Sequence, residues 1–163
     1  LVSIALYEQI LDEKKDLNAL LKAKEKIDYF LVNFPDTEYA MDLKFKKKLI
    51  QNQLAAKEMY VAKYYITAQK WIPAINRLKV VVKDYSETVF IEEALHRLVE
   101  VYYKIGLTEE AKTAAAILGY NYNSSEWYVQ SYKVLNKTYK RPKKSELKKN
   151  NGFIKRTINR ILN

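Results

Sequence analysis

Two stretches of 25 residues decide the fold, VAKYYITAQKWIPAINRLKVVVKDY at 61–85 and LVEVYYKIGLTEEAKTAAAILGYNY at 98–122. They repeat one pattern of apolar and small residues at an interval of 37 positions. The matched pairs are Val61 and Leu98, Ala62 and Val99, Tyr65 and Tyr102, Ala74 and Ala111, Leu78 and Ala115, Val81 and Leu118, and Tyr85 and Tyr122. A fixed interval of this length is typical of proteins built from stacked helical hairpins.

An earlier copy of the second half of this pattern lies 51 positions upstream, at Ala23, Ile27, Phe30 and Phe34. Each copy is followed by a polar turn, Pro35-Asp36-Thr37, Ser86-Glu87-Thr88 or Asn123-Ser124-Ser125. We expect the hydroxyls of Thr37, Thr88 and Ser125 to cap the helices that follow, because they can accept bonds from the free amides of a first turn.

The composition favours long helices with few breaks, since 163 residues include only three glycines and three prolines. One hairpin cannot bury both of its faces, so the units are expected to stack into a right-handed, all-α superhelix. Pro73 suits the first turn of a helix, where a missing amide costs nothing. Thr108 is expected to cap a helix with an acidic start at Glu109-Glu110.

The expected organisation is three repeats, a capping helix and a tail. The repeats are 1–37 with helices 1–11 and 17–34, 38–87 with helices 38–68 and 71–84, and 88–123 with helices 89–104 and 108–121. A break near Gln51-Asn52-Gln53 is the alternative to one long helix at 38–68. The region 124–139 should hold a helix that covers the open end of the stack, and 140–163 a basic tail with a short amphipathic helix at 153–162.

Several classes of site have no support in the sequence. No cysteine is present, which excludes disulfides, thiolate zinc sites and a cysteine nucleophile within these residues. Three scattered glycines cannot form a phosphate-binding loop. His96 is the only histidine, without companions at ligand spacing, and is expected to be a partly exposed helix residue. We therefore predict no enzyme activity, catalytic residue, metal or cofactor.

The charge is concentrated in the tail. Residues 1–132 carry 18 basic and 18 acidic residues, whereas 133–163 carry 11 basic residues against Glu146 alone. The candidates for contact with an anionic surface are Lys140, Arg141, Lys143, Lys144, Lys148, Lys149, Arg156 and Arg160. A basic amphipathic helix is typical of membrane surfaces or partner helices, while the alternative is a solvated tail whose helix docks on its own repeats.

Two resemblances are carried by particular residues. Ala62, Tyr65 and Ala74 fall where the tetratricopeptide repeat has its small and aromatic residues. A closer resemblance is to the BamD family, the lipoprotein subunits of the bacterial outer-membrane β-barrel assembly machinery. The segments that carry it are AQKWIPAINR at 68–77, EEALHRLVEVY at 92–102, GLTEEA at 106–111, LGYNY at 118–122 and SEWY at 125–128. It covers roughly residues 1–135, which look like the third to fifth repeats of a five-repeat protein.

The resemblance implies a scaffold at the periplasmic face of the outer membrane, with a lipid anchor in an N-terminal part that this sequence lacks. The implied partners are BamA-like POTRA domains, other subunits of the machinery and unfolded outer-membrane proteins, and no nucleic acid. Arg77 matches an arginine at the family's partner-binding surface, and we expect Asn76 and Trp71 beside it. For Trp71, packing within the repeat is the favoured interpretation and partner contact the alternative.

Two other functions stay open at this point. One is a cytoplasmic tetratricopeptide adaptor for a chaperone or secretion complex, and the other is a nucleic-acid-associated adaptor that uses the basic tail. The tail attracts nucleic acid by charge but has Phe153 as its one base-stacking aromatic residue. Tyr64, Tyr103 and Tyr132 are further candidates for a concave binding face, where tyrosine offers rigid area and a hydroxyl.

Overall fold

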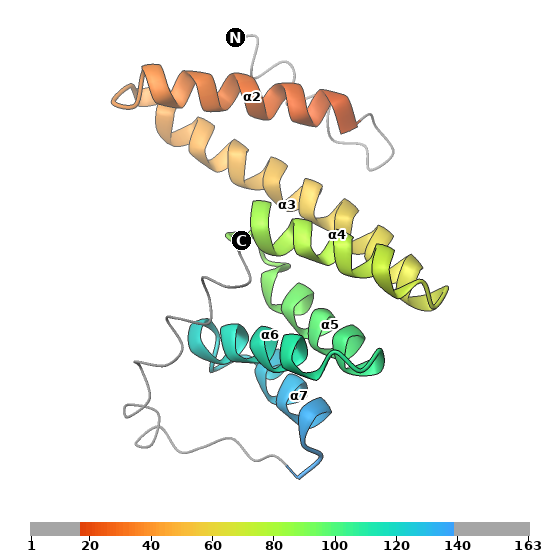
Figure 1. Ribbon diagram of the computed structural model, residues 1–163. Helices are drawn as coiled ribbons and strands as arrows, with labels where there is room; N and C mark the ends of the chain where they lie inside the picture. The colour runs from red at the N-terminus through yellow and green to blue at the C-terminus, as the bar shows by residue number, and fades with distance from the viewer. Residues whose placement is uncertain (1–16, 139–163) are drawn as a thin grey trace. The chain divides into compact units, whose positions relative to one another are not determined.

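The computed structural model describes residues 17–138, and every element in this range is a helix (Figure 1). The helices are α2 (Leu17–Asn33), α3 (Glu38–Thr67), α4 (Trp71–Asp84), α5 (Ile91–Lys104), α6 (Thr108–Asn121) and α7 (Glu126–Leu135). No strand occurs between 17 and 138. The predicted all-α class is confirmed, while the helices expected at 1–11 and 153–162 lie outside the described residues.

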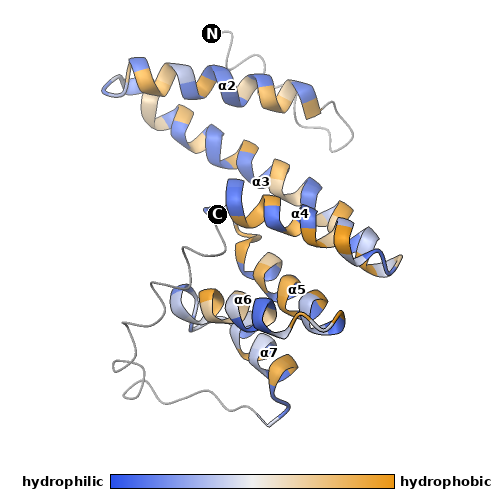
Figure 2. Ribbon diagram, in the orientation of Figure 1, coloured by the Kyte–Doolittle hydropathy of each residue, from blue (hydrophilic) through white to orange (hydrophobic). Residues whose placement is uncertain are grey.

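The chain divides into two compact units, Leu1–Lys57 and Glu58–Asn163, with the boundary inside α3. The helices α2, α4, α5 and α7 gather apolar residues on one side, whereas α3 has apolar residues around its whole circumference. Figure 2 shows hydrophobic and hydrophilic residues alternating along each helix rather than forming unbroken apolar runs. The division into three repeats and the handedness of their stacking stay predictions.

The first unit has a small core and one ion-pair cluster. Ala23 and Ile27 of α2 are fully buried, as is Ile50 of α3. Asp28 pairs with Lys24, one turn away on α2, and with Lys47 of α3. Burial opposes ionisation of Asp28, but the two ammonium groups together hold the pKa of this carboxyl below its ordinary value.

The helix α3 runs without interruption for 30 residues, so the alternative break near 51–53 does not occur. Its sequence contains neither glycine nor proline. It ends at Thr67, where Gln69 adopts a left-handed φ of 56°. The Lys70 amide then donates to the Tyr65 carbonyl at 2.8 Å, which satisfies an acceptor at the helix end.

The same turn recurs 37 positions later and supports the repeat register. After α5, the Leu107 amide donates to the Tyr102 carbonyl at 2.9 Å, and Gly106 has a φ of 84°. A left-handed residue at the end of a helix is usually glycine, because other residues have a Cβ that crowds this conformation. Glutamine therefore occupies in one copy the place that glycine occupies in the other.

The helix α5 is central to the second unit, where it packs against α4, α6 and α7. Small residues allow these close approaches. Ala62, Ala74, Val99 and Ala111 all have no exposed surface, as the repeat register predicts. At the contact of α6 with α7, a Cβ added to Gly119 would lie 2.8 Å from Cε2 of Tyr128, so only glycine fits there without a shift.

The predicted caps are correct in one case of four. The Ser125 hydroxyl caps α7 by accepting from the Trp127 amide at 3.1 Å. The hydroxyls of Thr37 and Thr88 instead donate backwards, to the carbonyls of Phe34 and Tyr85. Thr108 is the first residue of α6, and the residue before it provides no side-chain cap.

Two helix bounds also differ from expectation. The turn after α4 extends through Phe90, so α5 begins at Ile91 rather than 89. The last helix ends at Leu135 rather than 139, because Asn136 is extended. Its side-chain oxygen accepts from the amide and the hydroxyl of Thr138, at 3.1 and 2.8 Å. Such a local bond offers the backbone an alternative to the helix.

Candidate partner-binding surface

Arg77 lies on α4 with its side chain 46% exposed and is paired to Glu58 of α3. The Nη1 atom lies 3.2 Å from Oε2 and 3.5 Å from Oε1 of this carboxylate. Arg77 is therefore not part of the buried stripe of its helix, which Ala74, Ile75, Leu78 and Val81 form. The ion pair with Glu58 was not predicted, and no signal in the sequence separates this pairing from a solvated arginine.

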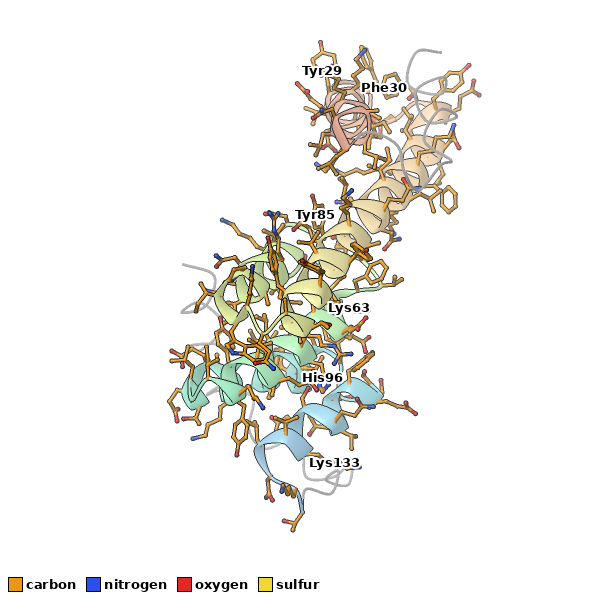
Figure 3. All side chains as sticks on the ribbon, turned by 90° about the vertical axis from the view of Figure 1, so that its right-hand side faces the viewer. Tyr29, Phe30, Lys63, Tyr85, His96 and Lys133 are labelled. Carbon is orange, nitrogen blue, oxygen red and sulfur yellow. The ribbon has the colours of Figure 1, made fainter. Side chains whose placement is uncertain are left out.

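Glu58 is the less exposed partner of this pair, with its side chain 16% exposed. It lies on the inner side of α3, one turn before the fully buried Ala62. Tyr85 (Figure 3) follows the end of α4 and is near enough to the same carboxylate to be affected by its charge. Burial, with the negative charges of Glu58 and Asp84, raises the pKa of the Tyr85 phenol. The carboxylate therefore sits between α3 and α4, while the guanidinium reaches toward solvent.

The three residues expected at the partner surface do not share one face of α4. With about 100° between successive residues, Asn76 lies about 100° and Trp71 about 120° around the helix from Arg77. Asn76 is exposed, whereas Trp71 is half-buried. Trp71 also begins the buried stripe formed by Ala74, Ile75 and Leu78. This position favours packing for Trp71 and leaves Arg77 as the residue best placed for a partner.

The three tyrosine candidates differ in exposure. Tyr64 on α3 is 63% exposed and Tyr103 on α5 is 46% exposed, so both can meet a partner. Tyr132 is half-buried and lies against Tyr128 of its own helix, with ring centroids 4.8 Å apart. Burial is the main cause that raises the pKa of the Tyr132 phenol. Tyr132 thus takes part in the packing of α7.

His96 is buried, and the expectation of a partly exposed residue is wrong. Only 3% of its surface is exposed. Its Nδ1 atom lies 2.9 Å from the hydroxyl oxygen of Ser131, which is itself fully buried on α7. Its ring also faces Trp127, with centroids 5.1 Å apart. His96 is therefore a contact between α5 and α7 (Figure 3).

A chain of charged groups continues from His96 along α5. Nε2 of His96 lies 3.5 Å from Glu100, and Arg97 donates to Glu100 at 2.7 Å. Arg97 also lies 3.5 Å from Glu93, which pairs with Lys63 of α3 at 2.9 Å. The contact with His96 and then the bond from Arg97 hold the pKa of Glu100 below its ordinary value, against the opposing effect of burial.

A hydroxyl, an imidazole and a carboxylate lie in sequence here, from Ser131 through His96 to Glu100, as in a catalytic triad. Burial of Ser131 and His96 gives the arrangement a different role. The Ser131 side chain has no exposed surface, so a substrate cannot reach its hydroxyl. A serine hydroxyl can both donate and accept, and it satisfies the buried imidazole nitrogen. The arrangement fixes α7 on α5. Across residues 17–138, no group of three or more histidine, aspartate or glutamate side chains could hold a metal ion.

Comparison with known proteins gives one family. Residues 1–117 match YfiO, described as an outer membrane lipoprotein. A protein of Caulobacter vibrioides named outer membrane protein assembly factor BamD is 39% identical over 162 residues, 99% of this chain and 52% of the relative. Proteins with that name from Rickettsia prowazekii and Neisseria meningitidis are 36% and 27% identical, over 83% and 72% of this chain and 54% and 44% of the relatives.

The chain spans about half the length of these relatives. The family match ends before α7, whereas the similarity to the Caulobacter protein extends over nearly the whole chain, basic tail included. Within residues 17–138, none of the helices has the length and apolar character required to cross a bilayer.

Proposed function

The chain belongs to the YfiO family of outer membrane lipoproteins, and on this premise we propose that it is a scaffold of the machinery that assembles β-barrel proteins in the outer membrane. The observation that carries the proposal is the similarity to proteins named outer membrane protein assembly factor BamD, at 39% and 36% identity. In this role it binds the periplasmic POTRA domains of a BamA-like partner and aids the insertion of unfolded outer-membrane proteins. Its place is the periplasmic face of the outer membrane, where a lipid anchor would hold the full-length protein.

Arg77 is the proposed centre of the partner surface. Its side chain is exposed and carries a permanent charge, and its planar group can bond a carboxylate through two nitrogens. Arginine is also enriched among the residues that contribute most to protein interfaces. Asn76 lies on the adjoining exposed face of α4 and can add a polar contact at the rim. Trp71, half-buried at the start of α4, is assigned to packing within the repeat.

Binding to the soluble POTRA domains of BamA from the same organism tests the proposal. We expect Arg77→Glu to weaken binding at least tenfold, about 1.4 kcal/mol, as measured by isothermal titration calorimetry. Lys79→Glu is the matched control, because Lys79 is exposed on another face of α4 and undergoes the same change of charge. Circular dichroism should show equal helicity for both variants.

Two outcomes of this binding assay would contradict parts of the proposal. Equal binding by the wild type and Arg77→Glu would move the contact away from this residue. No binding by the wild-type chain, with POTRA domains shown to be folded, would contradict the proposed partner. Fractionation of cells that express the full-length protein tests the location, and recovery in the cytoplasm would favour an adaptor of another system.

A further inference from the structure

We propose that Glu58 is a positioning residue that holds Arg77 by one nitrogen and leaves the opposite edge of the guanidinium for a carboxylate of the partner. The inference rests on the proposed function, in which Arg77 contacts the partner. It adds a second residue, on a different helix, that no feature of the sequence marks as part of the surface.

The pair meets through one nitrogen of the guanidinium. Both contacts between the side chains use Nη1 of Arg77, at 3.2 and 3.5 Å from the two oxygens of Glu58. A guanidinium carries five N–H groups in a fixed plane. The N–H groups of Nε and Nη2 point the same way along the other edge and suit two parallel bonds to one carboxylate. Among residues 17–138, Arg77 pairs with no acidic residue other than Glu58.

The two partners differ in burial. The Glu58 side chain is 16% exposed and the Arg77 side chain 46% exposed. A protein that approaches from solvent therefore meets the arginine before it meets the glutamate. Displacing Glu58 from Arg77 would leave a mostly buried carboxylate without its cation, which is strongly unfavourable. The partner's carboxylate is thus expected to join the pair and not to replace Glu58.

Holding Arg77 in place also lowers the entropic cost of binding. An arginine side chain has many rotamers, and a free one must give them up when it binds. Glu58 already restricts Arg77 to rotamers that bring Nη1 to the carboxylate. Binding then costs less conformational entropy, which is the general benefit of preorganisation. The like charge of Glu58 opposes the partner's carboxylate, but the guanidinium lies between the two acidic groups and screens one from the other.

The test is a double-mutant cycle in the same calorimetric assay with BamA POTRA domains. We expect Glu58→Gln to weaken binding about three- to tenfold, and Arg77→Met to weaken it about tenfold or more. In the Arg77→Met background, Glu58→Gln should have no further effect, because its action passes through Arg77. A merely structural role would weaken binding equally in both backgrounds.

Glu93→Gln is the matched control. The Glu93 side chain is 15% exposed and pairs with Lys63 of α3, a cation on a neighbouring helix. Glu93→Gln therefore resembles Glu58→Gln in the burial of the site and in the loss of one negative charge. Glu93→Gln should leave the affinity for POTRA domains within about twofold of the wild type, because a substitution at a site distant from Arg77 does not couple to it. Melting by circular dichroism confirms that each variant is folded at the assay temperature.

The outcomes separate the two proposals. If the wild type binds and Arg77→Met weakens binding, but Glu58→Gln binds as tightly as the wild type or more tightly, Glu58 does not position Arg77 and the inference is wrong. Tighter binding would identify Glu58 as a competitor of the partner. If the wild type does not bind POTRA domains at all, the proposed function fails, and the inference that depends on it fails too.

Discussion

Gln69 adopts a conformation at the end of α3 that glycine adopts at the equivalent turn after α5. A residue with a Cβ in the left-handed region destabilises the folded state by about 1–2 kcal/mol, and glycine removes this strain. Glycine also makes the unfolded chain more flexible, which offsets about 0.5–1 kcal/mol of the gain. We therefore expect Gln69→Gly to stabilise the protein by about 0.5–1 kcal/mol. Urea unfolding followed by circular dichroism measures this change.

The same substitution at Gln130 serves as the control. Gln130 is exposed within α7, where glycine removes helix propensity without any gain at a turn. Gln130→Gly should destabilise by up to about 1 kcal/mol, so the two variants are expected to change stability in opposite directions. A loss of stability in both would mean that the conformation of Gln69 carries no strain.

At the scale of helices, the contact of α7 with α5 contains one buried polar pair beside its apolar core. Ser131→Ala should destabilise the protein by about 1–3 kcal/mol, because it leaves the Nδ1 atom of buried His96 without the Ser131 hydroxyl. Thermal unfolding measures the effect. Ser124→Ala, in the exposed turn before α7, is the control and should lie within about 0.5 kcal/mol of the wild type. If Ser131→Ala is as stable as this control, the pair does not hold the helix.

The sequence predicts the helices well and their individual contacts poorly, for a physical reason. The 37-residue register locates buried residues such as Ala74 and Ala111, because every repeat must bury the same positions. His96 escapes this argument. The helix α5 packs on α4, α6 and α7, so nearly its whole circumference is covered, and a polar residue outside the usual apolar stripe is buried as well.

Contacts made by long charged side chains are hidden from sequence for another reason. Glu93, Arg97 and Glu100 are one turn apart, a spacing at which ion pairs within a helix are expected. Glu58 and Arg77 are 19 positions apart on different helices. From the sequence alone, many other acidic residues are equally suitable partners for Arg77. The repeat pattern fixes which helices meet but not which exposed charges pair between them.

At the scale of the whole chain, charge divides the sequence into two parts. Residues 1–132 hold equal numbers of acidic and basic residues, and the net charge of +10 comes from the segment that follows. The similarity to the Caulobacter protein extends over this segment, although the family match ends at residue 117. The match to this relative therefore includes the segment that carries the excess positive charge of this chain.

We predict that the tail binds anionic membrane surfaces independently of the repeats. From Lys140 to Asn163 it holds nine basic residues against Glu146 alone. Each basic residue near an anionic leaflet contributes about 1 kcal/mol, and apolar residues such as Phe153 and Ile158 can insert once charge has brought them close. Removal of residues 140–163 should abolish co-sedimentation with phosphatidylglycerol vesicles while leaving the melting temperature unchanged.

Salt and lipid composition distinguish this mechanism from simple packing of the tail. At about 0.5 M salt the screening length falls below about 5 Å, so binding to anionic vesicles should weaken strongly, and neutral phosphatidylcholine vesicles should not bind at any salt concentration. If the truncated protein melts several degrees lower and the full chain ignores anionic vesicles, then the tail stabilises the repeats. In that case its basic residues only solvate the outer face, because the apolar residues that would enter the membrane are already covered by protein.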